Sequence, residues 1–351
     1  MSEKYRRELV YKSFLLFVRM KESDVCDKTL RERTLETIRS SGVDKVVCLA
    51  LDPVYEPGGA RREDLSHVWV DNDYVLDLRK ELPDRILLGA SVHPYDPAFK
   101  DRVKKYVDEG AVLLKWIPSS QQINLAEEKT ATAMKFLATA GPGGKPLPLL
   151  LHVGPEFAIP SSDERTNPYN YLHWSGWDSF LNFMRFGKKW HVPKVKKIHQ
   201  NLESALNEGT TIIFAHCGLP YFFAGFLGGI FEHSEFKEVR TYLERAARGE
   251  FKGECYADVS ALATPFRKAY FESVRNLPPD RLLFGSDFPT PIFELSADTG
   301  EMARDFKAMM KGDLSRIIVP QDNLLDVNHR ELRHYFPDHP MFTNFSRLGL
   351  G

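Results

Sequence analysis

Seven short apolar segments recur along the 351-residue chain, and helix-like sequence separates several of them. They lie at residues 44–51, 85–92, 111–117, 148–154, 210–218, 254–262 and 281–288. They are continuous apolar runs without strict alternation, which indicates strands buried on both faces, as in a parallel sheet covered by helices. Residues 72–82, 127–140 and 265–277 carry helical patterns. This alternation of strands and helices predicts βαβ units and a parallel sheet or barrel.

A closed (β/α)8 barrel of the TIM type needs eight strands, one more than the sequence offers. The first strand, at 44–51, already follows two helical segments, at 3–20 and 28–42. We therefore expect an α/β fold of the TIM-barrel type whose first strand is missing from this chain. Residues 1–351 are expected to form a single domain, with lid insertions near 154–200 and 219–240.

Charge and composition narrow the classes of function. The formal net charge is −1, so the balance of charge favours neither nucleic acid nor a membrane surface as a partner. The apolar part of segment 3–20 is interrupted by Lys12 and is too short to span a bilayer. The four cysteines form no CxxC pair, which is typical of a reducing compartment. We expect a cytoplasmic protein that acts on a small molecule, and a homodimer is compatible with the sequence.

A titratable residue lies at the end of each predicted strand, where a barrel carries its catalytic groups. They are Asp52, His93, Lys115, His152, His216, Asp258 and Asp287. A single histidine at such a place is more often a core residue bonded to a main-chain carbonyl. His152 and His216 both follow purely apolar runs, however, and imidazole and carboxylate are common ligands of divalent ions. Together with Asp287, they predict a catalytic or metal site.

The motifs at these strand ends resemble those of a known family. LLLHVG, IIFAHCG and LLFGSDFPTP resemble strands five, six and eight of the amidohydrolase superfamily, in the branch that includes aminocarboxymuconate semialdehyde decarboxylase. GVDKVVCLA and SVHP fit its strands two and three, and HPMFTNFSRLGL fits its C-terminal helix. The resemblance implies a metal-dependent hydrolase, with a non-oxidative decarboxylase as the alternative. A third hypothesis is a non-catalytic barrel that binds a small ligand without metal.

The resemblance also implies roles for individual residues. His152 would be a metal ligand, and His216 would be either a second ligand or the base that activates a metal-bound water. Asp287 would ligate the metal or accept the proton of that water. Zinc is the expected ion, with manganese or iron as alternatives.

Four further residues are predicted to contact the substrate. They are Lys115, His93, His173 and Trp174. Lys115 would bind a substrate carboxylate, or would be carbamylated between two metals as in binuclear relatives, or would point out beyond its strand. His173 and Trp174 belong to an aromatic insertion that is expected to form a wall of the substrate pocket.

The chain departs from the family pattern at one point. The family carries an HxH pair at the end of strand one, and no HxH occurs in this sequence. A gene model that starts late, metal binding with fewer ligands, and a degenerate relative are three competing explanations. We favour the first, because His152, His216 and Asp287 are retained. Translation upstream of Met1 is then expected to reveal an apolar strand that ends in HxH.

Overall fold

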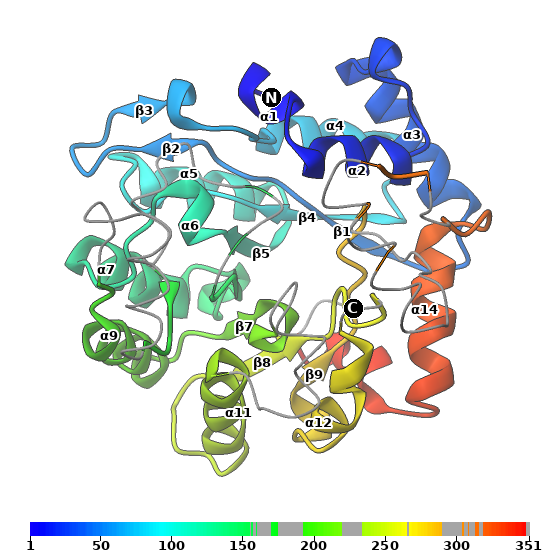
Figure 1. Cartoon of the computed structure of the whole chain (residues 1–351). Helices are drawn as coiled ribbons and strands as arrows, with labels where there is room; N and C mark the ends of the chain where they lie inside the picture. Colours follow the sequence, from blue (N-terminus) through cyan, green and yellow to red (C-terminus); the bar gives the residue numbers. More distant parts are fainter. Residues whose placement is uncertain are drawn as a thin grey trace.

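The seven predicted strands all occur in the computed structural model. It describes residues 1–154, 156, 159, 170–174, 192–219, 234–264, 267–289, 304, 308, 313–315 and 319–348. The strands are β1 (Val46–Leu49), β4 (Ile86–Ala90), β5 (Ala111–Trp116), β6 (Leu149–Leu151), β7 (Ile212–Phe214), β8 (Cys255–Asp258) and β9 (Leu282–Leu283). They form one parallel sheet in chain order. Figure 1 shows this sheet curling around the centre of the molecule, which confirms the predicted α/β fold of the TIM-barrel type.

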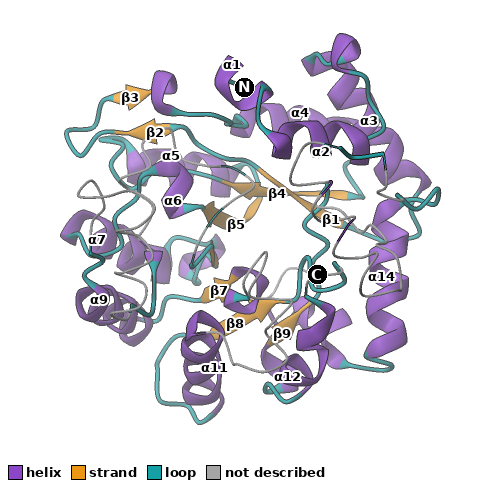
Figure 2. Ribbon diagram, in the orientation of Figure 1, coloured by secondary structure: helices purple, strands orange, loops and turns teal. Residues whose placement is uncertain are grey.

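Helices lie outside the strands, and several of them connect one strand to the next (Figure 2). They are α1 (Glu3–Arg6), α2 (Leu9–Phe17), α3 (Asp27–Ser40), α4 (Asn72–Glu81), α5 (Phe99–Asp108), α6 (Pro118–Gln121), α7 (Glu128–Phe136), α9 (Val195–Glu208), α11 (Ser234–Ala247), α12 (Phe271–Arg275) and α14 (Leu324–Tyr335). A two-stranded hairpin, β2 (Val54–Tyr55) and β3 (Arg61–Arg62), follows β1 and was not predicted.

Two predicted helices differ from the structure. The single helix expected over 3–20 is two helices. Glu8 adopts an extended conformation (φ −72°, ψ 149°) that separates them, and it is the N-cap residue of α2. The C-terminal helix expected in HPMFTNFSRLGL forms 3₁₀ turns at Pro340–Phe342 and Asn344–Leu348. Here the Asn344 amide donates to the carbonyl oxygens of Pro279 and Leu282 at 2.8 and 2.9 Å, so tertiary contacts decide the local conformation.

The strands bury apolar side chains on both of their faces. One cluster lies on the inner face of the sheet and contains Leu113, Leu150, Ile213, Tyr256 and Leu283, among other residues. The C-terminal 3₁₀ turn covers this cluster with Phe345 and Leu348. The larger cluster packs the outer face against the helices. Because side chains alternate along a strand, the residues two positions after these inner residues lie on the same face, nearer the carboxyl ends.

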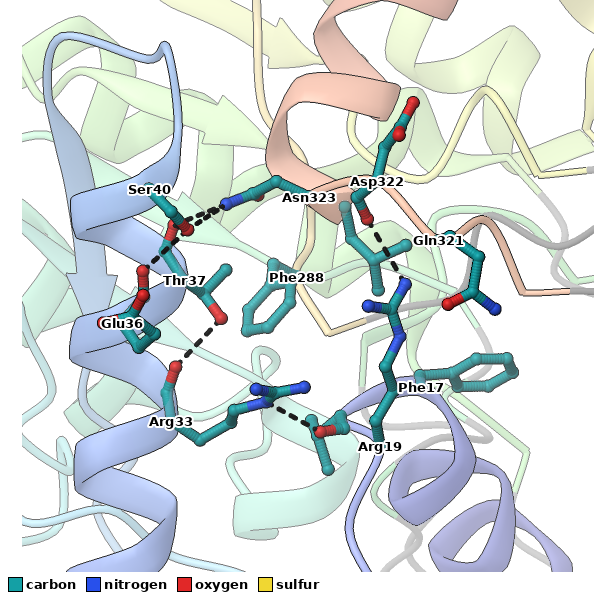
Figure 3. Close-up of a pocket in the computed structure, with 12 residues that line it drawn as sticks. Phe17, Arg19, Arg33, Glu36, Thr37, Ser40, Phe288, Gln321, Asp322 and Asn323 are labelled. Atoms are coloured by element: carbon teal, nitrogen blue, oxygen red, sulfur yellow. Dashed lines mark hydrogen bonds between the residues drawn. The ribbon is translucent and has the colours of Figure 1, made fainter.

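The two edges of the sheet are β1 and β9, which do not pair with each other in the described residues. The helices outside these edges do meet. The Asp326 carboxylate of α14 accepts from the Gly42 N–H at 2.8 Å, and the Asn323 amide donates to the Thr37 carbonyl oxygen at 2.7 Å and to Ser40 Oγ at 3.0 Å. Figure 3 shows the Asn323 contacts beside a polar hollow of about 230 Å³ between α2, α3 and the start of α14.

The lid insertions predicted near 154–200 and 219–240 lie mostly outside the described residues. Within them the structure describes 154, 156, 159, 170–174, 192–200, 219 and 234–240, which include the first turns of α9 and α11. None of the helices in the described parts of the chain combines the length and apolar character that a membrane span requires.

Candidate functional site

Three titratable side chains share the inner face of the sheet at its carboxyl end. Lys115 of β5, His152 after β6 and Asp258 of β8 each lie two positions beyond a member of the inner apolar cluster. They are 6%, 6% and 8% exposed. The register supports this arrangement, since Lys115 pairs with Leu150, the residue two positions before His152. The alternating pattern of the strands therefore directs these groups into the mouth of the barrel.

His216 and Asp287 enter the same region from turns that follow β7 and β9. Both have left-handed backbone conformations, with φ of 55° and 56°, and Cys217 has φ of 54°. This region costs an ordinary L-residue on the order of 1–2 kcal/mol, and such strain concentrates at functional sites. Here the strained turns bring imidazole and carboxylate together: His216 Nε2 lies 3.9 Å from Asp287 Oδ2.

His152 and His216 lie next to each other, with ring centroids 5.4 Å apart and planes at 69°. The structure therefore brings His152, His216 and Asp287 into one region, as the strand-end pattern predicts. Glu156 joins them, because its Oε2 lies 3.4 Å from His152 Nε2.

Lys115, His152 and Asp258 lie where water is largely excluded, whereas the Asp287 side chain is 37% exposed. Burial lowers the pKa of Lys115, and the neighbouring carboxylates of Asp258, Asp287 and Glu156 oppose that shift. Burial also lowers the pKa of His216, which Asp287 opposes. The lowered pKa makes His216 a neutral imidazole at neutral pH, and for Lys115 burial disfavours the charged form while the carboxylates favour it.

Ser260 and Asp258 contact His216 on the side away from Asp287. Ser260 Oγ lies 2.7 Å from His216 Nδ1, and the Ser260 carbonyl oxygen lies 3.3 Å from the same nitrogen. Asp258 Oδ1 accepts from the main-chain N–H groups of His216 and Ser260, both at 3.0 Å, and also from the Ser260 hydroxyl. These bonds fix the imidazole relative to the end of β8.

His93, predicted to contact the substrate, lies apart from this cluster. Its side chain is fully buried, and its Nε2 lies 2.8 Å from the Gln121 carbonyl oxygen. Its Nδ1 accepts from the Tyr95 N–H at 3.1 Å. Because a carbonyl can only accept, Nε2 carries the ring proton and both ring nitrogens are bonded to main chain. Both ring nitrogens are thus bonded within the fold, and substrate contact by His93 stays a prediction.

His173 and Trp174 lie beside the end of β6. The buried Glu235 carboxylate accepts from the N–H groups of Leu172 and His173 at 2.8 and 3.0 Å. The Asn170 amide also donates to the carbonyl oxygens of His152 and Gly154, at 3.1 and 2.9 Å. Segment 170–174 is thereby anchored next to His152, and substrate contact by His173 and Trp174 stays a prediction.

The donor types at the site fit a divalent metal, since imidazole nitrogen and carboxylate oxygen suit zinc, manganese and iron. Their arrangement fits less well. The donors form two pairs, His152 with Glu156 and His216 with Asp287. Among the described residues, no three His, Cys, Asp or Glu side chains are placed as a metal-binding group. The fit is one of donor chemistry, and we derive no catalytic step through a metal.

Comparison with known proteins identifies the family. Residues 49–322, more than half of the chain, match the family model described as amidohydrolase. The chain belongs to the amidohydrolase family. This agrees with the resemblance seen in the strand-end motifs, and the amidohydrolases are a family of enzymes. No curated protein matches this amidohydrolase.

Several solved structures are similar to this amidohydrolase over most of its length. A TIM-barrel protein from Bordetella bronchiseptica is 12% identical with a TM-score of 0.46, covering 98% of this chain and 93% of that one. A 2,6-dihydroxybenzoate decarboxylase is 12% identical with a TM-score of 0.44, covering 95% of both chains. A manganese-bound 5-carboxyvanillate decarboxylase variant from Novosphingobium aromaticivorans is 18% identical with a TM-score of 0.41, covering 90% and 88%.

Sequence reasoning missed Glu156, Ser260 and Arg267 in this amidohydrolase. Glu156 follows His152 by four residues in a loop, where spacing carries no geometric meaning. Ser260 follows Asp258 by two residues, a spacing that allows the observed local hydrogen bond. Arg267 is 3% exposed and donates to the carbonyl oxygens of Leu219 and Ser260 at 3.1 and 3.4 Å. No sequence signal distinguishes this buried arginine from a surface one.

Proposed function

We propose that this amidohydrolase, as one barrel domain over residues 1–351, is a metal-dependent hydrolase of a small molecule. The observation that carries the proposal is the group formed by the buried Lys115, His152 and His216 with the exposed carboxylate of Asp287 at the carboxyl end of the sheet. Opposed charges and perturbed pKa values in one buried place are typical of catalytic sites. The family membership supports the same reaction class.

In this proposal His216 and Asp287 move the proton of the attacking water. A neutral His216 accepts the proton at Nε2, and the Asp287 carboxylate at 3.9 Å stabilises the imidazolium that results. Lys115 donates to a carboxylate or to the developing oxyanion of the substrate, because an ammonium in a buried site favours negative charge.

A divalent metal would be held by His152 and Asp287, with His216 as a third donor when it does not act as the base. Zinc, manganese and iron are the candidates, and when bound the ion would polarise a water or carbonyl.

Turnover and metal content test this proposal together. Protein loaded separately with zinc, manganese or iron would be assayed on 2-pyrone-4,6-dicarboxylate, 2,6-dihydroxybenzoate and 5-carboxyvanillate, the compounds in the names of similar structures. We expect acid release from a hydrolysable substrate. Release of carbon dioxide instead would support the decarboxylase alternative. An absence of turnover and of bound metal would support the binding barrel.

The His216→Asn variant tests the assigned base. It should retain bound metal and lose about 10²–10⁴-fold in kcat, the contribution typical of general acid–base catalysis. His334→Asn makes the same change at an exposed position of α14 and should keep the parent activity. Parent-level turnover in His216→Asn would contradict the assignment.

A further inference from the structure

The hydrogen bonds around His216 determine which of its ring nitrogens carries the proton. Nδ1 faces two oxygens of Ser260, the hydroxyl at 2.7 Å and the carbonyl at 3.3 Å. Nε2 faces the opposite side, toward Asp287. The two nitrogens therefore have different surroundings, and the side chain is buried enough for those surroundings to decide the tautomer.

The donor and acceptor roles follow from the Asp258 oxygen. Asp258 Oδ1 accepts from two main-chain N–H groups at 3.0 Å and from the Ser260 hydroxyl, so this oxygen is an acceptor in all three bonds. A serine hydroxyl has one proton, and here that proton is directed to Asp258. Ser260 Oγ can then only accept from His216. The Ser260 carbonyl oxygen is also an acceptor only, so Nδ1 must donate.

We propose that Ser260 and Asp258 are positioning residues that hold His216 as the Nδ1–H tautomer, with the Nε2 lone pair directed toward the barrel mouth. The importance of this lone pair for turnover rests on the proposed function, because a base and a metal ligand both need it. The tautomer itself depends only on the hydrogen bonds. Histidine in water prefers the Nε2–H form, so the Ser260–Asp258 pair reverses the ordinary preference.

Nitrogen NMR of the full chain labelled with ¹⁵N-histidine reads the tautomer directly. Spectra would be recorded near pH 8 after dialysis against a chelator, so that no metal occupies Nε2. The His216 signal is identified by its absence in His216→Asn. We expect a protonated Nδ1 and an unprotonated Nε2 in the parent. A protonated Nε2 in the parent would overturn the proposal.

Variants at position 260 identify the group responsible. Ser260→Ala removes the hydroxyl, and the Nε2–H form should become detectable. Ser260→Thr retains a hydroxyl and should keep the tautomer of the parent. Ser91→Ala is the matched control, because Ser91 is also buried and donates to the Lys115 carbonyl oxygen at 2.9 Å. An unchanged tautomer in folded Ser260→Ala would overturn the role of Ser260. If that variant does not fold, the parent and Ser260→Thr spectra test the proposal. A protonated Nδ1 in both supports it, and a protonated Nε2 in either overturns it.

Turnover separates this inference from the proposed function. A protonated Nδ1 in a protein that hydrolyses none of the substrates would support the hydrogen-bond assignment and count against the proposed reaction. Metal-dependent hydrolysis by a protein with a protonated Nε2 would support the proposed reaction and overturn the hydrogen-bond assignment. If both proposals hold, Ser260→Ala should lower kcat with little change in KM, because in the proposal Ser260 acts through its bond to His216.

Discussion

His93 and His216 are the same residue type at comparable strand ends, and their surroundings give them different roles. Both ring nitrogens of His93 bond to main chain, whereas Nε2 of His216 faces Asp287. The sequence places both histidines correctly after their strands. It cannot distinguish them, because the deciding partners, Gln121 and Ser260, come from other segments of the fold.

The burial of His93 predicts a specific pH dependence of stability. Burial lowers its pKa from 6.5 to about 3, against the opposing effect of the Gln121 hydrogen bond. Between these values the unfolded chain binds the proton and the folded chain does not. His93 should therefore reduce the unfolding free energy as pH falls below 6.5, by up to about 1.4 kcal/mol per pH unit.

Denaturant unfolding between pH 4 and 6 measures this effect. His93→Gln should be less stable than the parent at neutral pH, because it disrupts buried hydrogen bonds, and its stability should change less with pH. His334→Gln, on the exposed side of α14, serves as the control and should follow the parent. Equal slopes in the parent and His93→Gln would show that His93 is not the group responsible.

At the scale of elements, the strands were the most predictable part of the fold. Most are short apolar runs buried on both faces, as expected for a parallel sheet covered by helices, while the edge strand β1 is only partly buried. The break in the N-terminal helix and the 3₁₀ turns at the C-terminus were not predictable from local pattern. The C-terminal turn depends on Asn344 reaching carbonyl oxygens some 60 residues away in sequence. Such contacts exist only once the sheet has formed.

The Glu235 carboxylate of helix α11 is one of the groups that anchor segment 170–174. Glu235 accepts two main-chain N–H groups, and a glutamine would offer one oxygen and place an NH₂ against the other N–H. Glu235→Gln should lower the unfolding free energy by about 1–3 kcal/mol, the cost of a buried unsatisfied donor. Glu244→Gln, in the same helix beside Arg240, should cost less than about 1 kcal/mol. Equal losses measured by denaturant unfolding would contradict the anchoring role.

At the scale of the whole molecule, the helices outside the two edge strands, β1 and β9, are in contact. Asn323 and Asp326 at the start of α14 bond to Thr37 of α3 and to Gly42 just after it, and Figure 3 shows the Asn323 bonds. Asn323 has two parts in this junction. Its Oδ1 accepts from the Leu325 N–H at 3.0 Å and caps α14, while its amide nitrogen bonds to Thr37 and Ser40. A substitution that keeps one part and removes the other can separate them.

The variants Asn323→Asp and Asn323→Ala make this separation. Asn323→Asp retains the cap and loses the bonds to α3, so it should destabilise the protein by about 1–3 kcal/mol. Asn323→Ala should cost about 1 kcal/mol more, because the cap is lost as well. Denaturant unfolding of both variants measures the difference. If Asn323→Asp matches the parent, the bonds between the helices do not contribute to stability.

The same junction has a consequence for the order in which the chain folds. Every strand of the main sheet pairs with its neighbour in chain order, so the sheet can grow by successive short loop closures. The Asn323–Thr37 bond instead joins residues 286 positions apart. We expect it to form after the rate-limiting step, so that Asn323→Asp accelerates unfolding and leaves refolding nearly unchanged. Stopped-flow kinetics would show this difference, and an equal effect on both rates would place the junction among the early contacts.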